Sequence, residues 1–182
     1  MTAATETELP NLKKIVSRFS LEEIPKVVIE TDSNYFSAYY GAYCLMPAMN
    51  NHQITESLIA NGYRPWLPYS SAIKAVGKDE STVITPLLVT SEKAFLKSYD
   101  ATILEKEAGD EEGMFAVGVV SELKPAENGE KPTLVWYASP YAMDLVEANI
   151  TLATNTLDYL MGDEEGLSIP TRTITNSILI LS

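Results

Sequence analysis

The sequence predicts an α/β fold, with a mixed, mostly parallel open sheet covered by helices on both faces. Thr82–Val89 is an apolar run of strand length without polar alternation, which is typical of a strand buried on both sides. Met114–Val120 shows the same pattern. Thr90, Ser91 and Glu92 follow the first run directly, and a hydroxyl before a helix former indicates a strand that leads into a helix.

The chain is interpreted as one α/β domain spanning residues 1–182. A length of 182 residues with 46% hydrophobic residues supplies enough apolar surface for one sizeable core. Residues 1–9 are polar, and we expect them to form a flexible lead. Residues 176–182 contain a short apolar run, which we expect to be a final strand or the juxtamembrane part of a longer, membrane-anchored chain.

Charge and cysteine content exclude several classes of function. The formal net charge is −12 and the 13 Lys and Arg residues are spread along the chain, so nucleic acid and anionic membranes are poor partners. Cys44 is the only cysteine, which excludes an internal disulfide and any CxxC motif. His52 is the only histidine, which excludes a zinc site built on several imidazoles.

The first elements are a helix and a strand. Pro10 suits a first helical turn, and apolar residues recur at helical spacing as far as Phe19. Ser20–Glu23 is expected to form a turn at most, because Pro25 follows at once. Lys26–Thr31 is then expected to be a strand.

The next elements follow a polar stretch around residue 50. Apolar spacing predicts a short helix over residues 54–61, with His52 at its start and Gly62 just after its end. Pro65–Tyr69 contains two prolines and is expected to be extended but not a central strand. Ser70 or Ser71 is expected to begin a short helix that runs to Val76.

The second half of the chain predicts a hairpin and a final helix. Glu105–Gly113 is expected to be a solvated loop. Asn128-Gly129 is a turn signal, so Thr133–Ala138 is expected to pair antiparallel with the strand before it. A last helix ends before Gly162, and its buried stripe is expected to consist of Ile150, Ala153, Thr154, Leu157 and Met161.

Candidate binding residues lie where two predicted strands end. Ser33 and Asn34 follow the first strand, and Thr90 and Ser91 follow the second. In open α/β sheets, ligands bind at the carboxyl ends of strands. We therefore expect these four side chains to contribute to a ligand or partner site, with helix capping as the alternative role of Ser91.

A tyrosine-rich segment spans Tyr35–Met49 and carries no charged residue. Such a segment is able to serve as a buried arm, as a surface for a partner protein, or as a platform on which sugar rings stack. Tyr39 and Tyr40 are the candidate contact residues in the last two cases.

The sequence offers little catalytic chemistry. Cys44 and His52 are the only available thiol and imidazole, and Cys44 lacks the glycine flanks of a nucleophile elbow. Asp32 and Glu122 are the strand-end acids that a glycosidase would need. Phosphate loops are absent, and the repeated GDEEG turns lack the ligand alternation of an EF-hand. We expect no enzymatic activity, no cofactor and no bound metal.

Several separated stretches follow one pattern of order and spacing: His52–Thr55, Leu67–Ile73, Thr85–Ser91, Gly113–Val119 and Asn155–Glu165 with Ser168-Ile169. In the same order, they resemble an HPIT-like turn, a PYARSL-like segment, an LLTTS strand end, a GPFxLAV strand and an NWLxGDE ending. These motifs are those of one protein family, the auxiliary component of gliding-motility-type ABC transport systems. Gln53 and Pro170 depart from the family pattern.

The resemblance implies an extracytoplasmic domain similar to class I glutamine amidotransferases, a flavodoxin-like fold, without their catalytic triad. It also implies a non-catalytic role beside an ABC permease and its ATPase, with a membrane helix following the domain. No catalytic residue is carried over from this family.

Three functions are therefore open. The leading hypothesis is a non-catalytic sensor or adaptor domain that binds a partner protein, an extracellular glycan or a peptide. The first alternative is an amidotransferase-like or other hydrolase that uses Cys44 and His52. The second is a carbohydrate-binding module that uses Tyr39 and Tyr40.

Overall fold

The computed structural model describes residues 10–76, 81–127, 129–144 and 146–162. The expected flexible lead at 1–9 and the expected strand or juxtamembrane segment at 176–182 lie outside these residues. All statements below about absent features apply to the described part of the chain.

The largest sheet has six strands, and all pairings among them are antiparallel. The strand order is β1 (Leu21–Ile24), β7 (Ala72–Ala75), β10 (Ala116–Leu123), β8 (Thr82–Val89) and β5 (Ala48–Met49), and β11 (Thr133–Tyr137) pairs with β10. The prediction of a mostly parallel sheet with helices on both faces, similar to class I glutamine amidotransferases or flavodoxin, is therefore wrong.

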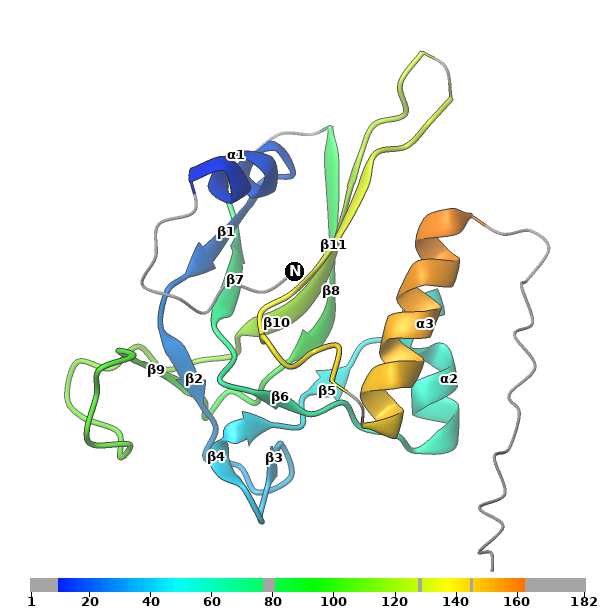
Figure 1. Ribbon diagram of the computed structural model, residues 1–182. Coiled ribbons are helices and arrows are strands. Elements are labelled where there is room, and N and C mark those ends of the chain that lie inside the picture. Colours follow the sequence, from blue (N-terminus) through cyan, green and yellow to red (C-terminus); the bar gives the residue numbers. More distant parts are fainter. Residues whose placement is uncertain (1–9, 77–80, 128, 145, 163–182) are drawn as a thin grey trace, which may run out of the picture.

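Two smaller sheets lie at one end of the six-stranded sheet (Figure 1). The two-stranded sheet pairs β2 (Val27–Ile29) with β9 (Phe95–Lys97). The three-stranded sheet has the order β3 (Phe36–Ser37), β4 (Gly41–Leu45) and β6 (Leu67–Pro68). Both are antiparallel as well. Most of the tyrosine-rich segment therefore lies in a small sheet completed by β6, while its last residues form β5 of the main sheet.

Parallel pairing fails because the helix expected after β8 does not form. The chain turns at Ser91 and enters β9 instead of a helix. Parallel neighbours need a long crossover, usually a helix, and β9 with its following loop brings the chain back into β10 antiparallel to β8. The predicted burial of this strand on both sides is also wrong in part, since Val83 and Pro86 of β8 are exposed.

Two short segments expected to be a turn and a helix are strands. Ser20–Glu23 lies mostly in β1, and the expected helix between Ser70 and Val76 is replaced by β7. The two strands pair antiparallel, with Leu21 opposite Ala75. Local sequence did not reveal this pairing because the partners are about fifty residues apart.

The predicted helices form at three of the expected places. They are α1 (Pro10–Arg18), α2 (Gln53–Asn61) and α3 (Glu147–Met161). Gly62 and Gly162 follow α2 and α3 with φ angles of 69° and 65°, a left-handed conformation that favours glycine, as the sequence predicted. Figure 1 shows α2 and α3 side by side on one side of the six-stranded sheet.

The predicted buried stripe of α3 faces solvent. Ile150, Leu157 and Met161 are exposed, whereas the buried face consists of Ala148, Asn149, Leu152 and Thr156. The polar residues on this face are bonded internally: for example, the Tyr137 hydroxyl lies 2.7 Å from Thr156 Oγ1. Hydrophobicity alone therefore indicated the wrong face of this helix.

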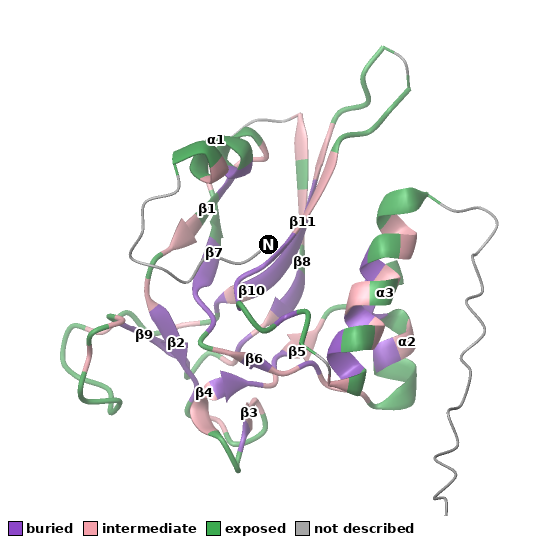
Figure 2. Ribbon diagram, viewed as in Figure 1, coloured by how far each residue is buried: buried purple, intermediate pink, exposed green. Residues whose placement is uncertain are grey.

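The core is centred on β10, which is buried along most of its length (Figure 2). The β10–β11 hairpin forms as predicted, with Val120 opposite Val135. The larger apolar cluster joins β8 and β10 to α2 and α3, and a smaller one joins β10 and β11 to α1. Gly118 sits at an irregularity in the β10–β8 register, where Leu88 and Tyr137 leave no room for a side chain.

Candidate functional site

The turns after β2 and β8 meet around one buried residue, Glu30, which is 0% exposed. Its Oε1 accepts hydrogen bonds from the backbone N–H of Thr31 and of Asp32, each at 2.9 Å, and from Ser91 Oγ at 2.7 Å. Its Oε2 accepts from the Ser91 backbone N–H at 2.9 Å. Glu30 therefore holds the two predicted strand-end turns together, although their strands belong to different sheets.

The candidate residues of these turns mostly serve internal bonds. Thr90 is buried, and its Oγ1 accepts from the Phe115 backbone N–H at 2.8 Å. Asn34 donates from its backbone and its side chain to Asp32 Oδ1, at 3.0 and 2.9 Å. Ser33 is exposed on the same turn. The hydroxyl and amide groups that the sequence singled out are thus largely used to fix the loops.

Asp32 is also held by its turn. Backbone hydrogen bonding from Asn34, followed by the hydrogen bond from Lys93, lowers the pKa of the Asp32 carboxyl group. Lys93 Nζ lies 3.3 Å from Asp32 Oδ2. Glu122, the other candidate acid, is on β10 and pairs with Lys131 Nζ at 2.7 Å, so the two acids belong to separate local networks.

Exposed aromatic rings gather on the three-stranded sheet in two groups. In the first, here called the Tyr39 group, Tyr39 packs edge-on against Tyr40, with 4.8 Å between ring centroids. Tyr40 packs edge-on against Trp66 at 5.3 Å. Tyr39 is 87% exposed and Tyr40 is 47% exposed. The Tyr39 group therefore presents a connected aromatic surface to solvent.

The second group, here called the Tyr69 group, contains Tyr43, Tyr69 and Tyr141. Tyr43 and Tyr69 stack with 4.8 Å between centroids and an interplanar angle of 18°, and Tyr141 lies 6.2 Å from Tyr69. Tyr69 has a φ of 52°, a left-handed conformation that is rare for a bulky residue. The backbone bond from Tyr69 N–H to the Tyr43 carbonyl, at 3.0 Å, helps to hold it there.

Arg64 lies two residues before Trp66 in sequence, and its side chain contacts Asn34 and Tyr35. Its guanidinium carbon is 5.7 Å from the centroid of the Tyr35 ring, and Nη1 donates to the Asn34 carbonyl. Within the described residues it makes no ion pair with a carboxylate.

Cys44 and His52 occupy structural positions. Cys44 lies in β4 opposite Pro68 and is 1% exposed, and burial raises the pKa of its thiol, which lowers the thiolate fraction. His52 is the N-cap of α2, as predicted, and its Nδ1 accepts from the Ile54 backbone N–H at 3.2 Å. Burial lowers the pKa of His52, and the nearby Glu122 charge partly opposes this shift.

The first GDEEG turn, Gly109–Gly113, forms an ion pair with a lysine. Lys97 is 3% exposed, and its Nζ lies 2.7 Å from Asp110 Oδ2 and 2.5 Å from Glu107 Oε2. Burial disfavours the charged form, but the hydrogen bonds to Asp110 and Glu107 outweigh it and raise the pKa of Lys97. The second GDEEG copy lies outside the described residues apart from its first glycine. Among described residues, no group of three or more His, Cys, Asp or Glu is placed to hold a metal ion.

No helix in the described ranges has the length and apolar content required to cross a membrane. Sequence reasoning identified Tyr39 and Tyr40, but it missed Glu30, Trp66, Arg64 and the Tyr69 group. The uncharged, tyrosine-rich segment Tyr35–Met49 is the only local sequence signal for this aromatic surface. The remaining residues join the site through β4–β6 pairing and through the Arg64–Asn34 contact, whose partners are 30 residues apart, and a single sequence does not reveal such pairings.

Comparisons of the chain with protein-family models, with curated proteins and with solved structures found no match. The resemblance to ABC transport auxiliary components therefore rests on the sequence motifs alone.

Proposed function

We propose that the protein is a non-catalytic adaptor domain that binds another protein through the Tyr39 group. The observation that carries the proposal is the 87% exposure of Tyr39, whose ring continues into Tyr40 and Trp66. Connected exposed apolar patches mark interaction sites in soluble proteins, and Tyr, Trp and Arg are enriched among residues that dominate binding energy.

The orientation of the rings favours a protein over a sugar as the partner. Tyr39 and Tyr40 meet at 85°, and Tyr40 and Trp66 meet at 69°, so the rings present alternating edges and faces. A sugar platform uses one flat, accessible ring face, whereas an irregular aromatic surface suits the side chains of a protein. The hydroxyls of the tyrosines remain available for hydrogen bonds at the rim of such an interface.

The motif resemblance supplies the class of partner. It implies a domain on the extracytoplasmic face of a membrane, beside the permease of an ABC-type transport system that an ATPase energises. A role as a sensor or adaptor within that system agrees with the internal use of the strand-end hydroxyls. Partner contact then relies on the aromatic rings and not on a polar cleft.

Site-specific photocrosslinking tests the proposal. We would place p-benzoylphenylalanine at Tyr39 in the full-length protein in its native cells, and at Val83 as a control. Val83 is 58% exposed and lies near the opposite end of β8 from the small sheets. The expected result is a crosslink at Tyr39 to a membrane-transport protein, identified by mass spectrometry, and none at Val83.

Absence of a protein adduct at Tyr39, or the same adduct at both positions, would overturn the proposal. Binding to a glycan panel that is lost in Tyr39→Ala and Tyr40→Ala would replace it with the carbohydrate-binding function. The two variants remove exposed rings, so the free energy of unfolding is expected to change little and serves as the folding control.

A further inference from the structure

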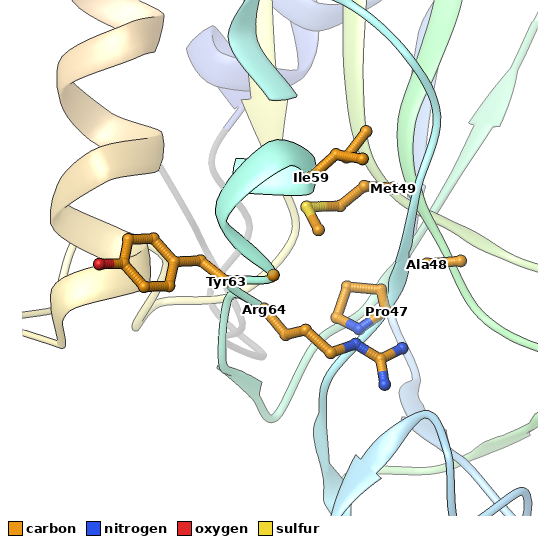
Figure 3. A pocket seen from close by; sticks show the side chains of 7 residues that line it. Pro47, Ala48, Met49, Ile59, Tyr63 and Arg64 are labelled. Atoms are coloured by element: carbon orange, nitrogen blue, oxygen red, sulfur yellow. The ribbon is translucent and has the colours of Figure 1, made fainter. Parts of the chain in front are cut away.

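A pocket of about 290 Å³ opens between the end of α2 and the edge strand β5. Its wall is mostly apolar, with Pro47, Ala48 and Met49 on one side and Ile59 and Gly62 on the other. Figure 3 shows that the side chains of Ile59 and Met49 approach each other across it. Pockets for drug-sized ligands have volumes of roughly 300–1,000 Å³, so this pocket, at the lower end, fits one aliphatic side chain with its terminal group better than a cofactor.

Arg64 provides the polar end of this pocket. Figure 3 shows its guanidinium group extending beside Pro47, whereas the Tyr63 ring points away from the pocket. The Tyr63 hydroxyl donates to Glu147 Oε1 at 2.8 Å, which fixes that ring outside. Within the pocket, therefore, the guanidinium is the only charged group among the lining residues.

The guanidinium is positioned by neutral partners. The Asn34 carbonyl accepts one of its hydrogen bonds, and the Tyr35 ring supports the cation from its face. A guanidinium has five N–H donors, so several remain for a ligand. In a chain with 25 acidic and 13 basic residues, a half-buried arginine without a carboxylate partner among the described residues is unusual.

The charges at the pocket favour an anion despite a nearby helix terminus. The carboxyl end of α2 carries a partial negative charge of about half a unit, which disfavours an anion. Arg64 carries a full positive charge and offers bidentate hydrogen-bond geometry, which matches a carboxylate. Arg64 is therefore the one formally charged residue among those that line the pocket, on a molecule whose formal net charge is −12.

We propose that this pocket binds the C-terminal residue of a partner polypeptide, with an aliphatic side chain between Ile59 and Met49 and the carboxylate on Arg64. This inference rests on the proposed function and names the feature of the partner that is recognised. A chain-terminal Leu, Ile or Val provides both the apolar side chain and the carboxylate on one residue.

Binding of defined peptides tests the inference. The probes are fluorescein-labelled Ser-Gly-Ser-Gly-Leu with a free carboxylate, the same peptide with a C-terminal amide, and the free-carboxylate peptide ending in Gly. Fluorescence polarisation with the full chain is expected to show at least about 10-fold tighter binding of the Leu carboxylate than of the amide, because a charge-assisted hydrogen bond is lost. The Gly peptide should bind more weakly as well, because it leaves the apolar wall unfilled.

Two variants separate the contributions. Arg64→Gln should abolish the preference for the carboxylate over the amide. Ile59→Trp, at a 42% exposed position, should weaken both Leu peptides by obstructing the pocket while leaving Arg64 in place. Lys74→Gln is the matched charge control, since Lys74 pairs with Glu22 on β1 and should leave peptide binding unchanged.

Equal binding of acid and amide, or a carboxylate preference that survives Arg64→Gln, would overturn the inference. So would binding of free 4-methylpentanoate with no binding of the peptides, which would indicate a small-molecule site. Crosslinking at Tyr39 together with no peptide discrimination would leave the proposed function standing and this inference refuted. Peptide discrimination without crosslinking would refute the role of the Tyr39 group.

Discussion

Replacing Glu30 with glutamine keeps the shape of a fully buried side chain but removes half of its acceptors. The two carboxyl oxygens accept four hydrogen bonds, three at Oε1 and one at Oε2. In the better orientation, the glutamine amide oxygen takes the Oε1 position and its NH₂ group faces the Ser91 N–H, donor against donor. Because an unsatisfied buried donor costs about 1–3 kcal/mol and charge assistance is lost as well, we expect Glu30→Gln to lower the free energy of unfolding by about 2–4 kcal/mol.

Urea unfolding followed by tryptophan fluorescence measures this loss, because the chain contains two tryptophans. A loss of 3 kcal/mol corresponds to a decrease in Tm of roughly 6–12 °C in a domain of this size. The control is Glu92→Gln, which changes an exposed acid next to Ser91 and is expected to alter stability by less than about 0.5 kcal/mol. If Glu30→Gln unfolds at the same urea concentration as Glu92→Gln, then Glu30 does not hold the two turns together.

Three further changes probe the core and a half-buried acid. Gly118→Ala places a Cβ 3.0 Å from side-chain carbons of Leu88 and Tyr137, so it should cost about 1–3 kcal/mol in denaturant unfolding, and an unchanged midpoint would argue against this packing. Tyr137→Phe removes the bond to Thr156 and should cost about 0.5–1.5 kcal/mol. Burial raises the pKa of Tyr137 to about 12, so the unfolded chain loses the hydroxyl proton at a lower pH than the folded chain does. The wild type should therefore lose stability as the pH rises from 10 to 12, and the phenylalanine variant should lose less. Burial likewise raises the pKa of Glu23 above its ordinary value of 4.5, so the folded state takes up a proton at a higher pH than the unfolded state does. The wild type should therefore gain stability relative to Glu23→Gln as the pH falls from 7 toward 4.5. A difference in stability between the two proteins that does not change with pH would contradict this.

Sequence reasoning located elements whose signals are local. Gly62 and Gly162 marked the ends of α2 and α3 because a left-handed residue after a helix favours glycine. Asn128-Gly129 marked the β10–β11 hairpin because two adjacent strands need only a short turn. In each case the residues that determine the element lie within a few positions of each other.

Strand direction and helix orientation depended on distant residues instead. An apolar run such as β8 fits a strand in either type of sheet, and only the path from Ser91 into β9 makes it antiparallel. The face of α3 depended on Asn149, whose side chain exchanges hydrogen bonds with the Trp66 backbone at 2.8 and 2.9 Å. A polar residue that is buried because its partners lie about eighty positions away has no signature in local hydrophobicity.

The same distinction explains why the candidate site shifted from hydroxyls to rings. The polar atoms of Thr90, Ser91 and Asn34 predict a binding site, yet Ser91 donates to the buried Glu30 carboxyl group, which would be costly to leave unpaired. Thr90 accepts from the Phe115 backbone N–H, and Asn34 donates to Asp32. At the three-stranded sheet, Tyr39 and Tyr40 remain exposed. Side-chain groups that are not used in bonds within the fold are available to a partner. At this end of the molecule, they are the rings of the Tyr39 group and the N–H donors of Arg64 that have no partner among the described residues.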